Sequence, residues 1–197
     1  MSIPPAPLEM QKAALRAAAL ARRDALSGDH RAAAAQVIAA RGLPVAIRPG
    51  MVVSGYSPIR SELDPAPLMR ALAAQGARLA LPAITARDRP LNFRVWSPGD
   101  ALVRGPLGIL EPPPEATEVI PDIVLVPLAA FDRLGHRIGY GAGHYDRSLA
   151  SLRSARHIVA IGVAFAAQQI AAVPMQPHDV ALDYVLTETR SFDFRSS

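Results

Sequence analysis

The chain has 197 residues, half of them hydrophobic, which is enough for one globular domain with a sizeable core. It contains no cysteine, so disulfides, thiolate metal sites and cysteine nucleophiles are excluded. Its 21 basic and 17 acidic side chains give a formal net charge of +4, which favours anionic ligands.

The distribution of charge and apolar residues disfavours two classes of partner. The arginines are dispersed, with Arg22-Arg23 as the only adjacent basic pair, whereas a nucleic-acid-binding face usually carries a basic stripe. No apolar run has membrane-spanning length, and charged residues interrupt the N-terminal region where a signal peptide needs an apolar segment. We therefore expect no nucleic acid, no membrane, a cytoplasmic location and a monomer.

Two helices are predicted in the first part of the chain. Residues 1–7 are proline-rich and are expected to be frayed. The alanine-rich run 8–26 has the apolar spacing of an amphipathic helix that ends at Ser27-Gly28. A second helix is predicted from about Asp29, its expected N-cap, to Arg41.

The first helix carries Lys12 and Arg16, which lie four residues apart and therefore share one face. Two cations on one face either remain solvated or meet an anion such as a phosphate. Lys12 is also the single lysine of the chain.

Short strands and one helix are predicted in the middle of the chain. The expected strands are 51–56, 77–82 and 92–96, and the last alternates as a half-exposed strand would. A helix is predicted from Pro65 to Gln75. The loop after the first strand contains Ser57 and Glu62 at a carboxyl end, where open α/β sheets bind ligands. Taken alone, Glu62 reads as a surface charge.

The apolar run Ile123–Val126, stopped by Pro127, is typical of a parallel strand buried on both faces. A polar turn is expected after it, followed by a segment that we call the glycine loop, formed by Gly139, Tyr140, Gly141, Ala142 and Gly143. The absent side chains let backbone amides approach an anion, and the predicted helix 144–152 adds its unpaired N-terminal amides. Three arginines are expected to crowd this loop, namely Arg133, Arg137 and Arg147. The loop could also serve only as a turn.

In the last part of the chain we predict a buried strand at 158–163 and a short helix at 164–172. The tail after Thr187 is polar. This order of elements predicts an α/β fold, a single three-layer α/β/α domain over residues 1–197 with a mostly parallel, Rossmann-like sheet.

At the glycine loop the chain resembles the 5-formyltetrahydrofolate cyclo-ligases, also called methenyltetrahydrofolate synthetases. The matching residues are Pro127, Phe131-Asp132, Gly135, Arg137, Gly139, Gly141-x-Gly143 and Tyr145-Asp146. Weaker matches lie at Lys12-x-x-x-Arg16, at the loop of Glu62, at Gly108-Ile109-x-Glu111-Pro112 and at the closing pattern with Asp179, Asp183 and Thr187. Where the family usually has a second tyrosine before Tyr145-Asp146, this chain has His144.

The resemblance implies an enzyme that uses ATP and Mg²⁺ to cyclise 5-formyltetrahydrofolate to 5,10-methenyltetrahydrofolate through an imidate phosphate, with release of ADP and phosphate. It implies ATP contacts at Lys12, Arg16, Arg137, Ile138, Gly139, Tyr140, Gly141, Ala142, Gly143, His144 and Tyr145. It implies contacts with a reduced folate, with or without a polyglutamate tail, at Ser57, Glu62, Tyr140, Gly141, Ala142, Gly143 and His144.

The resemblance also implies catalytic roles for Arg137 and Tyr145, and Mg²⁺ ligation by Asp146 and Asp179. Judged on sequence alone, a helix cap or a salt bridge is favoured over a metal ligand for each of these two carboxylates. A non-catalytic sensor of phosphorylated metabolites on the same fold is the alternative to an enzyme.

Overall fold

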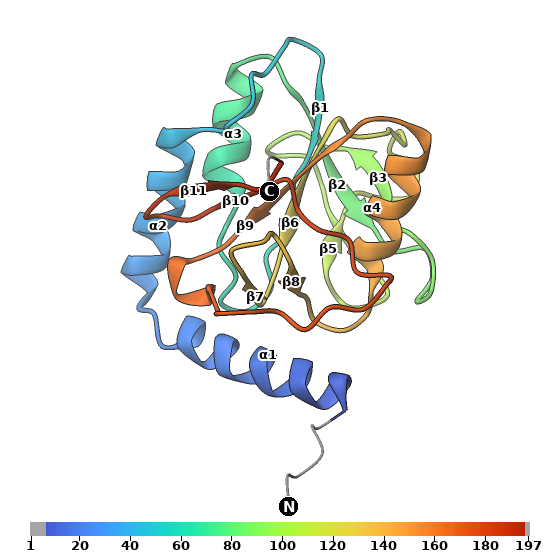
Figure 1. Ribbon diagram of the computed structural model, residues 1–197. Helices are drawn as coiled ribbons and strands as arrows, with labels where there is room; N and C mark the ends of the chain where they lie inside the picture. Colours follow the sequence, from blue (N-terminus) through green and yellow to red (C-terminus); the bar gives the residue numbers. More distant parts are fainter. Residues whose placement is uncertain (1–6, 196–197) are drawn as a thin grey trace, which may run out of the picture.

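Seven strands form the central sheet of the protein in a computed structural model that describes residues 7–195 (Figure 1). Their order across the sheet is β11-β10-β9-β6-β1-β2-β3. The strands are β1 (Val52–Ser54), β2 (Arg78–Ala83), β3 (Asn92–Val95), β6 (Ile123–Pro127), β9 (Val159–Val163), β10 (Tyr184–Leu186) and β11 (Ser191–Asp193). The inner strands run parallel, and the edge strands β3 and β11 are antiparallel to their neighbours. The predicted α/β fold with a mostly parallel sheet is confirmed.

Strand β6 lies at the centre of the sheet because its side chains are apolar on both faces. It pairs with β1 through Val53 and Ile123, and with β9 through Ile123 and Val159. Residues 123–126 are fully buried. Ile123 and Leu125 belong to one core, and Val124 and Val126 to the other. The expectation of a strand buried on both faces is confirmed.

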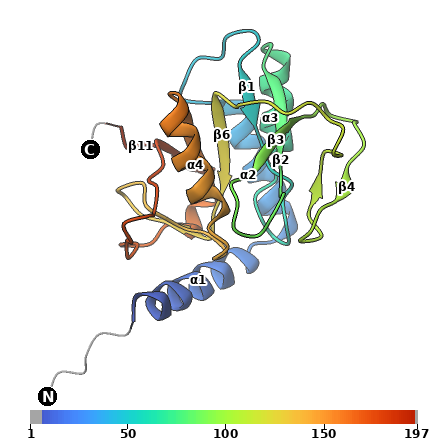
Figure 2. The same cartoon turned by 90° about the vertical axis from the view of Figure 1, so that its right-hand side faces the viewer.

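Helices cover both faces of the sheet. On one face lie α2 (Gly28–Arg41) and α3 (Ala66–Ala74), and on the other lies α4 (His144–Ala155) (Figure 2). Helix α1 (Leu8–Asp24) crosses below the sheet in Figure 1, at the end where β6 finishes. Among the described residues, none of the helices combines the length and apolar character needed to cross a membrane.

Two small hairpins lie beside the sheet. The first pairs β4 (Val103–Arg104) with β5 (Leu110–Glu111), and the second pairs β7 (Ala130–Phe131) with β8 (Arg137–Ile138). The second hairpin replaces the simple polar turn that was expected between β6 and the glycine loop. It brings Arg137 back to the end of β6, directly before that loop.

Several predicted boundaries are wrong for local reasons. Helix α2 is capped by Ser27 and not by Asp29, because the Ser27 side chain accepts a hydrogen bond from the amide of His30. Strand β3 does not alternate, because Arg94 is buried beside Phe93 and donates a hydrogen bond to the carbonyl of Pro112. The prediction of fraying covers residues 1–7, and residues 1–6 of that range lie outside the described residues.

The predicted helix 164–172 is only a 3-10 turn, Ala166–Gln168. The buried side chain of Gln168 donates to the carbonyls of Leu128 and Ala129 and accepts from the amide of Phe165. Because these bonds tie the segment to the end of β6, the chain continues as extended backbone instead of a helix. The tail after Thr187 also contains strand β11, which was not predicted.

Candidate active site

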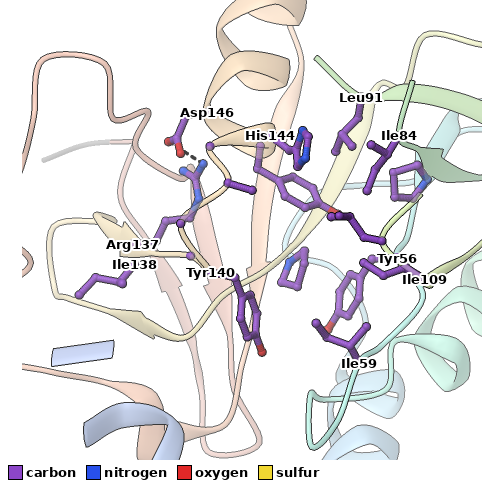
Figure 3. Close-up of a pocket in the computed structure, with 18 of the residues that line it drawn as sticks. Tyr56, Ile59, Ile84, Leu91, Ile109, Arg137, Ile138, Tyr140, His144 and Asp146 are labelled. Carbon is purple, nitrogen blue, oxygen red and sulfur yellow. Dashed lines mark hydrogen bonds and ion pairs between the residues drawn. The ribbon is translucent and has the colours of Figure 1, made fainter. Parts of the chain in front are cut away.

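A cleft of about 340 Å³ lies at the end of the sheet where β1 and β6 finish. Helix α1, the loop 56–62, the β4–β5 hairpin, the glycine loop with the start of α4, and the segment 176–179 all contribute to its lining. Figure 3 shows Arg137 and Asp146 at one side of the cleft and Tyr56 and Ile59 at the other. The apolar side chains of Ile84, Leu91 and Ile109 lie on the same side as Tyr56 (Figure 3).

The glycine loop joins β8 to α4 through two positive backbone angles, at Gly141 (φ 97°) and Gly143 (φ 67°). A side chain at Gly143 would also lie 2.7 Å from Nη1 of Arg147, so the position favours glycine twice. Two arginines hold the loop by its carbonyl groups. Arg16 Nε donates to Gly139 O at 2.7 Å, and Arg147 Nη2 donates to Ala142 O at 2.6 Å. With its carbonyls bound in this way, the loop can present amides and the N-terminus of α4 to an anion.

Arg137 and Asp146 form a buried ion pair on the α4 side of the cleft. Arg137 Nη2 donates to Asp146 Oδ1 at 2.8 Å, and its Nη1 donates to the carbonyl of Val180. The side chain of Arg137 is only 4% exposed. Burial lowers the pKa of Arg137, and the charges of Asp146 and Asp179 oppose that shift. Two carboxylates therefore favour the charged form of this buried guanidinium.

Lys12 and Asp179 form a second pair across the mouth of the cleft. Lys12 Nζ lies 2.5 Å from Asp179 Oδ2, and the same oxygen accepts a hydrogen bond from the amide of Gln176 at 2.7 Å. Burial acts to raise the pKa of Asp179, but the hydrogen bonds from Lys12 and Gln176 outweigh it and hold the pKa below its usual value. Lys12 and Arg16 thus both point at the cleft, as their spacing on one helix face predicts.

Glu62 lies on the opposite side, in the loop after β1. Its Oε2 accepts a hydrogen bond from the amide of Ile59 at 2.8 Å, and burial raises its pKa. Ser57 Oγ donates to the carbonyl of Leu110 at 2.5 Å, which ties this loop to β5. Ser57 therefore has only its acceptor lone pairs to offer a ligand.

Two tyrosines line the cleft near these charges. Burial raises the pKa of Tyr140 to about 12, with Glu62 as the next largest cause. Burial also raises the pKa of Tyr145 far above its ordinary value. Both phenols therefore stay protonated at neutral pH, so they can donate hydrogen bonds but cannot act as bases.

His144 is the first residue of α4 and is 8% exposed. Its Nδ1 lies 3.3 Å from the carbonyl of Arg89 and 3.5 Å from Nη2 of Arg147. Its Nε2 is buried and has no hydrogen-bond partner among residues 7–195. The ring is therefore held on one side and has unused hydrogen-bonding capacity on the other.

Every residue that the sequence singled out for ligand contact lines this one cleft. They are Lys12, Arg16, Ser57, Glu62, Arg137, Ile138, Gly139, Tyr140, Gly141, Ala142, Gly143, His144, Tyr145, Asp146 and Asp179. Their roles toward ligands remain predictions. Of the three arginines expected at the glycine loop, Arg137 and Arg147 contact the site, whereas Arg133 is exposed in the turn between β7 and β8.

The segment 107–112, which resembles the family segment near the folate, also reaches the cleft, because the β4–β5 hairpin brings Leu107, Leu110 and Glu111 to its lining. Sequence reasoning missed one contributor. Arg23, buried at the end of α1, bonds to Tyr140 but reads in the sequence as half of a surface Arg-Arg pair. No sequence periodicity distinguishes it from Arg22.

Comparisons with curated proteins point to one family. The sequence profile of the 5-formyltetrahydrofolate cyclo-ligase family matches residues 9–188. A 5-formyltetrahydrofolate cyclo-ligase of Mycolicibacterium smegmatis is 37% identical over 150 residues, which cover 72% of this chain and 75% of that protein. The protein of the same name from Escherichia coli K12 is 32% identical over 138 residues, covering 68% and 75% respectively.

Solved structures point the same way. The NMR structure of the Aquifex aeolicus 5,10-methenyltetrahydrofolate synthetase matches with a TM-score of 0.77 at 30% identity, and the match covers 95% of both chains. A 5,10-methenyltetrahydrofolate synthetase from Mycoplasma pneumoniae matches with a TM-score of 0.71 at 26% identity, covering 91% of this chain and 99% of that one. These findings decide against a non-catalytic sensor, and the chain belongs to the 5-formyltetrahydrofolate cyclo-ligase family of enzymes.

Proposed function

We propose that the cleft binds ATP along the glycine loop and reduced folate along the loop of Glu62, and that it closes 5-formyltetrahydrofolate to 5,10-methenyltetrahydrofolate. The observation that carries this proposal is the division of the cleft into two unlike halves. One half holds three cations, two of them paired with Asp146 and Asp179, and a loop of backbone amides. The other holds Glu62 with Arg60 and Glu111 among Tyr56 and apolar side chains.

The cationic half suits a triphosphate. Lys12, Arg16 and Arg137 come from two distant parts of the chain and line the same end of the cleft. Phosphoryl transfer needs little covalent chemistry from a protein, because positioning and charge neutralisation supply most of the catalysis. The glycine loop and these three cations offer both.

The carboxylates of this half suit a magnesium ion that shares its ligands with phosphate. The described residues contain no group of three or more His, Cys, Asp or Glu side chains that could hold a metal alone. Protein hydrogen bonds and ion pairs fall on Oδ1 of Asp146 and on Oδ2 of Asp179, which leaves one oxygen of each for a cation. One or two carboxylates together with phosphate oxygens and water are the usual ligands of Mg²⁺ beside a nucleotide. When bound, the metal supplies charge neutralisation for the phosphates.

The other half suits the pterin of a folate. A carboxylate such as Glu62 accepts hydrogen bonds from ring N–H groups, and its partial burial strengthens such bonds. The apolar residues Ile84, Leu91 and Ile109 line the cleft on the Tyr56 side and can exclude water from this half.

The resemblance to the family implies the steps of the proposed reaction. The formyl oxygen on N5 attacks the terminal phosphorus of ATP, the bond to ADP breaks, and an imidate phosphate forms. N10 then adds to the formyl carbon and loses its proton, and the carbon–oxygen bond breaks to release phosphate. Arg137 stabilises the charge that develops on the transferring phosphoryl group, and Tyr145 donates a hydrogen bond from a phenol that stays protonated.

The direct test follows the absorbance of the methenyl product with purified protein, 5-formyltetrahydrofolate, ATP and Mg²⁺. Product formation is expected only when all three small molecules are present. Arg137→Met should lose most of the turnover, whereas the Arg133→Met control, altered at an exposed hairpin residue, should keep it. Product formation without ATP, or equal activity of the two variants, would contradict the proposal.

A further inference from the structure

Arg23 is a buried cation that the proposed reaction does not use. It lies in the last turn of α1 and is 1% exposed, although arginine is among the residues least often fully buried. It does not line the cleft. Its neighbour Arg22 is exposed and donates to the carbonyl of Ala167, away from the glycine loop. A buried guanidinium needs partners, and the identity of those partners indicates its task.

The hydrogen bonds of Arg23 reach the two loops that form opposite sides of the cleft, and its Nε also lies 3.6 Å from Oδ1 of Asp24 on its own helix. Its Nη1 donates to the phenol oxygen of Tyr140 at 2.5 Å, in the middle of the glycine loop. Its Nε donates to Ser61 Oγ at 3.0 Å, one residue before Glu62. Ser61 Oγ in turn donates to the carboxylate of Asp24. One side chain of α1 therefore fastens both loops to the same helix end.

The direction of these hydrogen bonds matters for Glu62. Because the Tyr140 oxygen accepts from a guanidinium, which has no acceptor, the phenol proton is free to be donated elsewhere. Tyr140 and Glu62 both line the cleft, and the charge of Glu62 is, after burial, the next largest cause that raises the pKa of Tyr140. Arg23 thus fixes both the phenol of Tyr140 and Ser61, the residue directly before Glu62.

We propose that Arg23 is a positioning residue for the folate half of the cleft, which fixes Tyr140 and the loop of Ser61 so that Glu62 is held ready for the pterin. This inference rests on the proposed function, because it takes Glu62 as the folate contact. Under this proposal, the backbone of Tyr140 forms part of the glycine loop, whereas its phenol helps to position Glu62.

Two consequences separate this role from a merely structural one. Loss of Arg23 should weaken folate binding much more than nucleotide binding, because the nucleotide half is held by Arg16 and Arg147. The effects of removing Arg23 and the Tyr140 hydroxyl should not add, because both changes remove the same hydrogen bond between these two residues.

The experiment measures direct binding of 5-formyltetrahydrofolate and of a non-hydrolysable ATP analogue by calorimetry, without turnover. In Arg23→Met, folate affinity should fall about 10- to 100-fold, as expected when a buried charged hydrogen bond is removed, while analogue affinity changes less than about threefold. Arg23→Lys should recover part of the folate affinity. The matched control Arg22→Met removes the adjacent guanidinium and should bind both ligands normally.

Tyr140→Phe should reproduce the selective loss, and the double variant should bind folate no worse than the weaker single variant. Equal losses of folate and analogue, or additive losses in the double variant, would overturn the proposal. If Arg23→Met does not fold, Tyr140→Phe and Ser61→Ala decide alone, and the proposal fails unless both lose folate affinity selectively. Glu62→Gln distinguishes the folate contact of Glu62 from the positioning role of Arg23. Normal folate binding in Glu62→Gln would refute the folate contact. Weakened folate binding in Glu62→Gln together with normal folate binding in Arg23→Met would refute only the role of Arg23.

Discussion

Lys12 and Asp179, separated by 167 residues in the sequence, meet with 2.5 Å between Nζ and Oδ2 and close one side of the cleft. The pair neutralises both groups before any ligand arrives. When a nucleotide binds with its metal ion, Lys12 would exchange the carboxylate of Asp179 for a negative phosphate. Asp179 would exchange the ammonium of Lys12 for the positive metal ion.

The single lysine allows a chemical test of this arrangement. Because Lys12 is 7% exposed and ion-paired, an acylating reagent should reach it much more slowly than the N-terminal amine. Activity should disappear in step with acylation of Lys12, since that change removes the charge, and an ATP analogue should slow the loss. Peptide mapping follows the two amines separately. Full acylation of Lys12 with normal turnover would mean that α1 serves only as scaffold.

Substitution of Asp146 should make the enzyme poorly responsive to magnesium. Asp146→Asn keeps the side-chain volume and can still accept a hydrogen bond from Arg137. It removes the negative charge that we propose binds the magnesium ion. Turnover should fall by about 100-fold or more, an effect typical of lost electrostatic stabilisation, with a higher magnesium requirement. Asp193→Asn, in the exposed pair with Arg195, is the control. A normal magnesium titration in folded Asp146→Asn would remove the metal role.

Glu62→Gln should weaken folate binding selectively. The amide keeps the shape of the side chain but replaces a charged acceptor, so folate affinity should fall about 10- to 100-fold with ATP affinity nearly unchanged. In the wild type, burial raises the pKa of Glu62, so folate affinity should decline as pH falls through that raised pKa. Calorimetry at several pH values measures both effects. Parallel losses of folate and ATP affinity would indicate a structural loop.

The same carboxylate should leave a signature in stability. A raised pKa means that folded Glu62 keeps its proton at pH values where the unfolded chain, with a pKa near 4.5, has lost it. This group therefore makes the folded state less stable as pH rises from about 4.5 through the folded pKa. The unfolding free energy of Glu62→Gln relative to wild type should rise across that window and then level off. Denaturant titrations at each pH give the comparison, and a difference that is flat with pH would contradict the shift.

His144→Tyr should be tolerated. The substitution removes a buried Nε2 that has no partner among the described residues, and it restores the tyrosine that the family usually carries at this place. We expect turnover within a few-fold of wild type and folate affinity that is equal or tighter. Steady-state kinetics at saturating ATP measure both. Loss of activity with an unchanged unfolding temperature would assign a role to the imidazole itself.

The sequence predicts those parts of the fold whose signals are local. The apolar run of β6 predicts a buried strand, and the glycine loop with the directly following start of α4 predicts a turn that leads into a helix. Lys12 and Arg16 are likewise one helical turn apart, so their shared face follows from spacing.

The remaining features depend on contacts between distant segments. Arg23 is buried because Ser61 and Tyr140 meet it, and neither is near it in the sequence. The predicted helix after β9 shortens to one 3-10 turn because Gln168 bonds to the end of β6. Strand β11 is short and polar at both ends, so only pairing with β10 identifies it. Periodicity carries no information about such long-range partners.

The order of the strands determines when the enzyme can first become active during synthesis. Strand β6 lies between β1 and β9, and the cleft is closed by a bond between residue 12 and residue 179. A ribosome releases the glycine loop well before the segment that pairs with α1, so a nascent chain has the glycine loop but not the complete cleft. Contacts between residues so far apart in the sequence also form slowly, because the chain loses entropy on closing the intervening loop before those contacts can stabilise it. Chains truncated before residue 179 should therefore accumulate as inactive products that expose the sheet, and chaperones and proteases would recognise them as such.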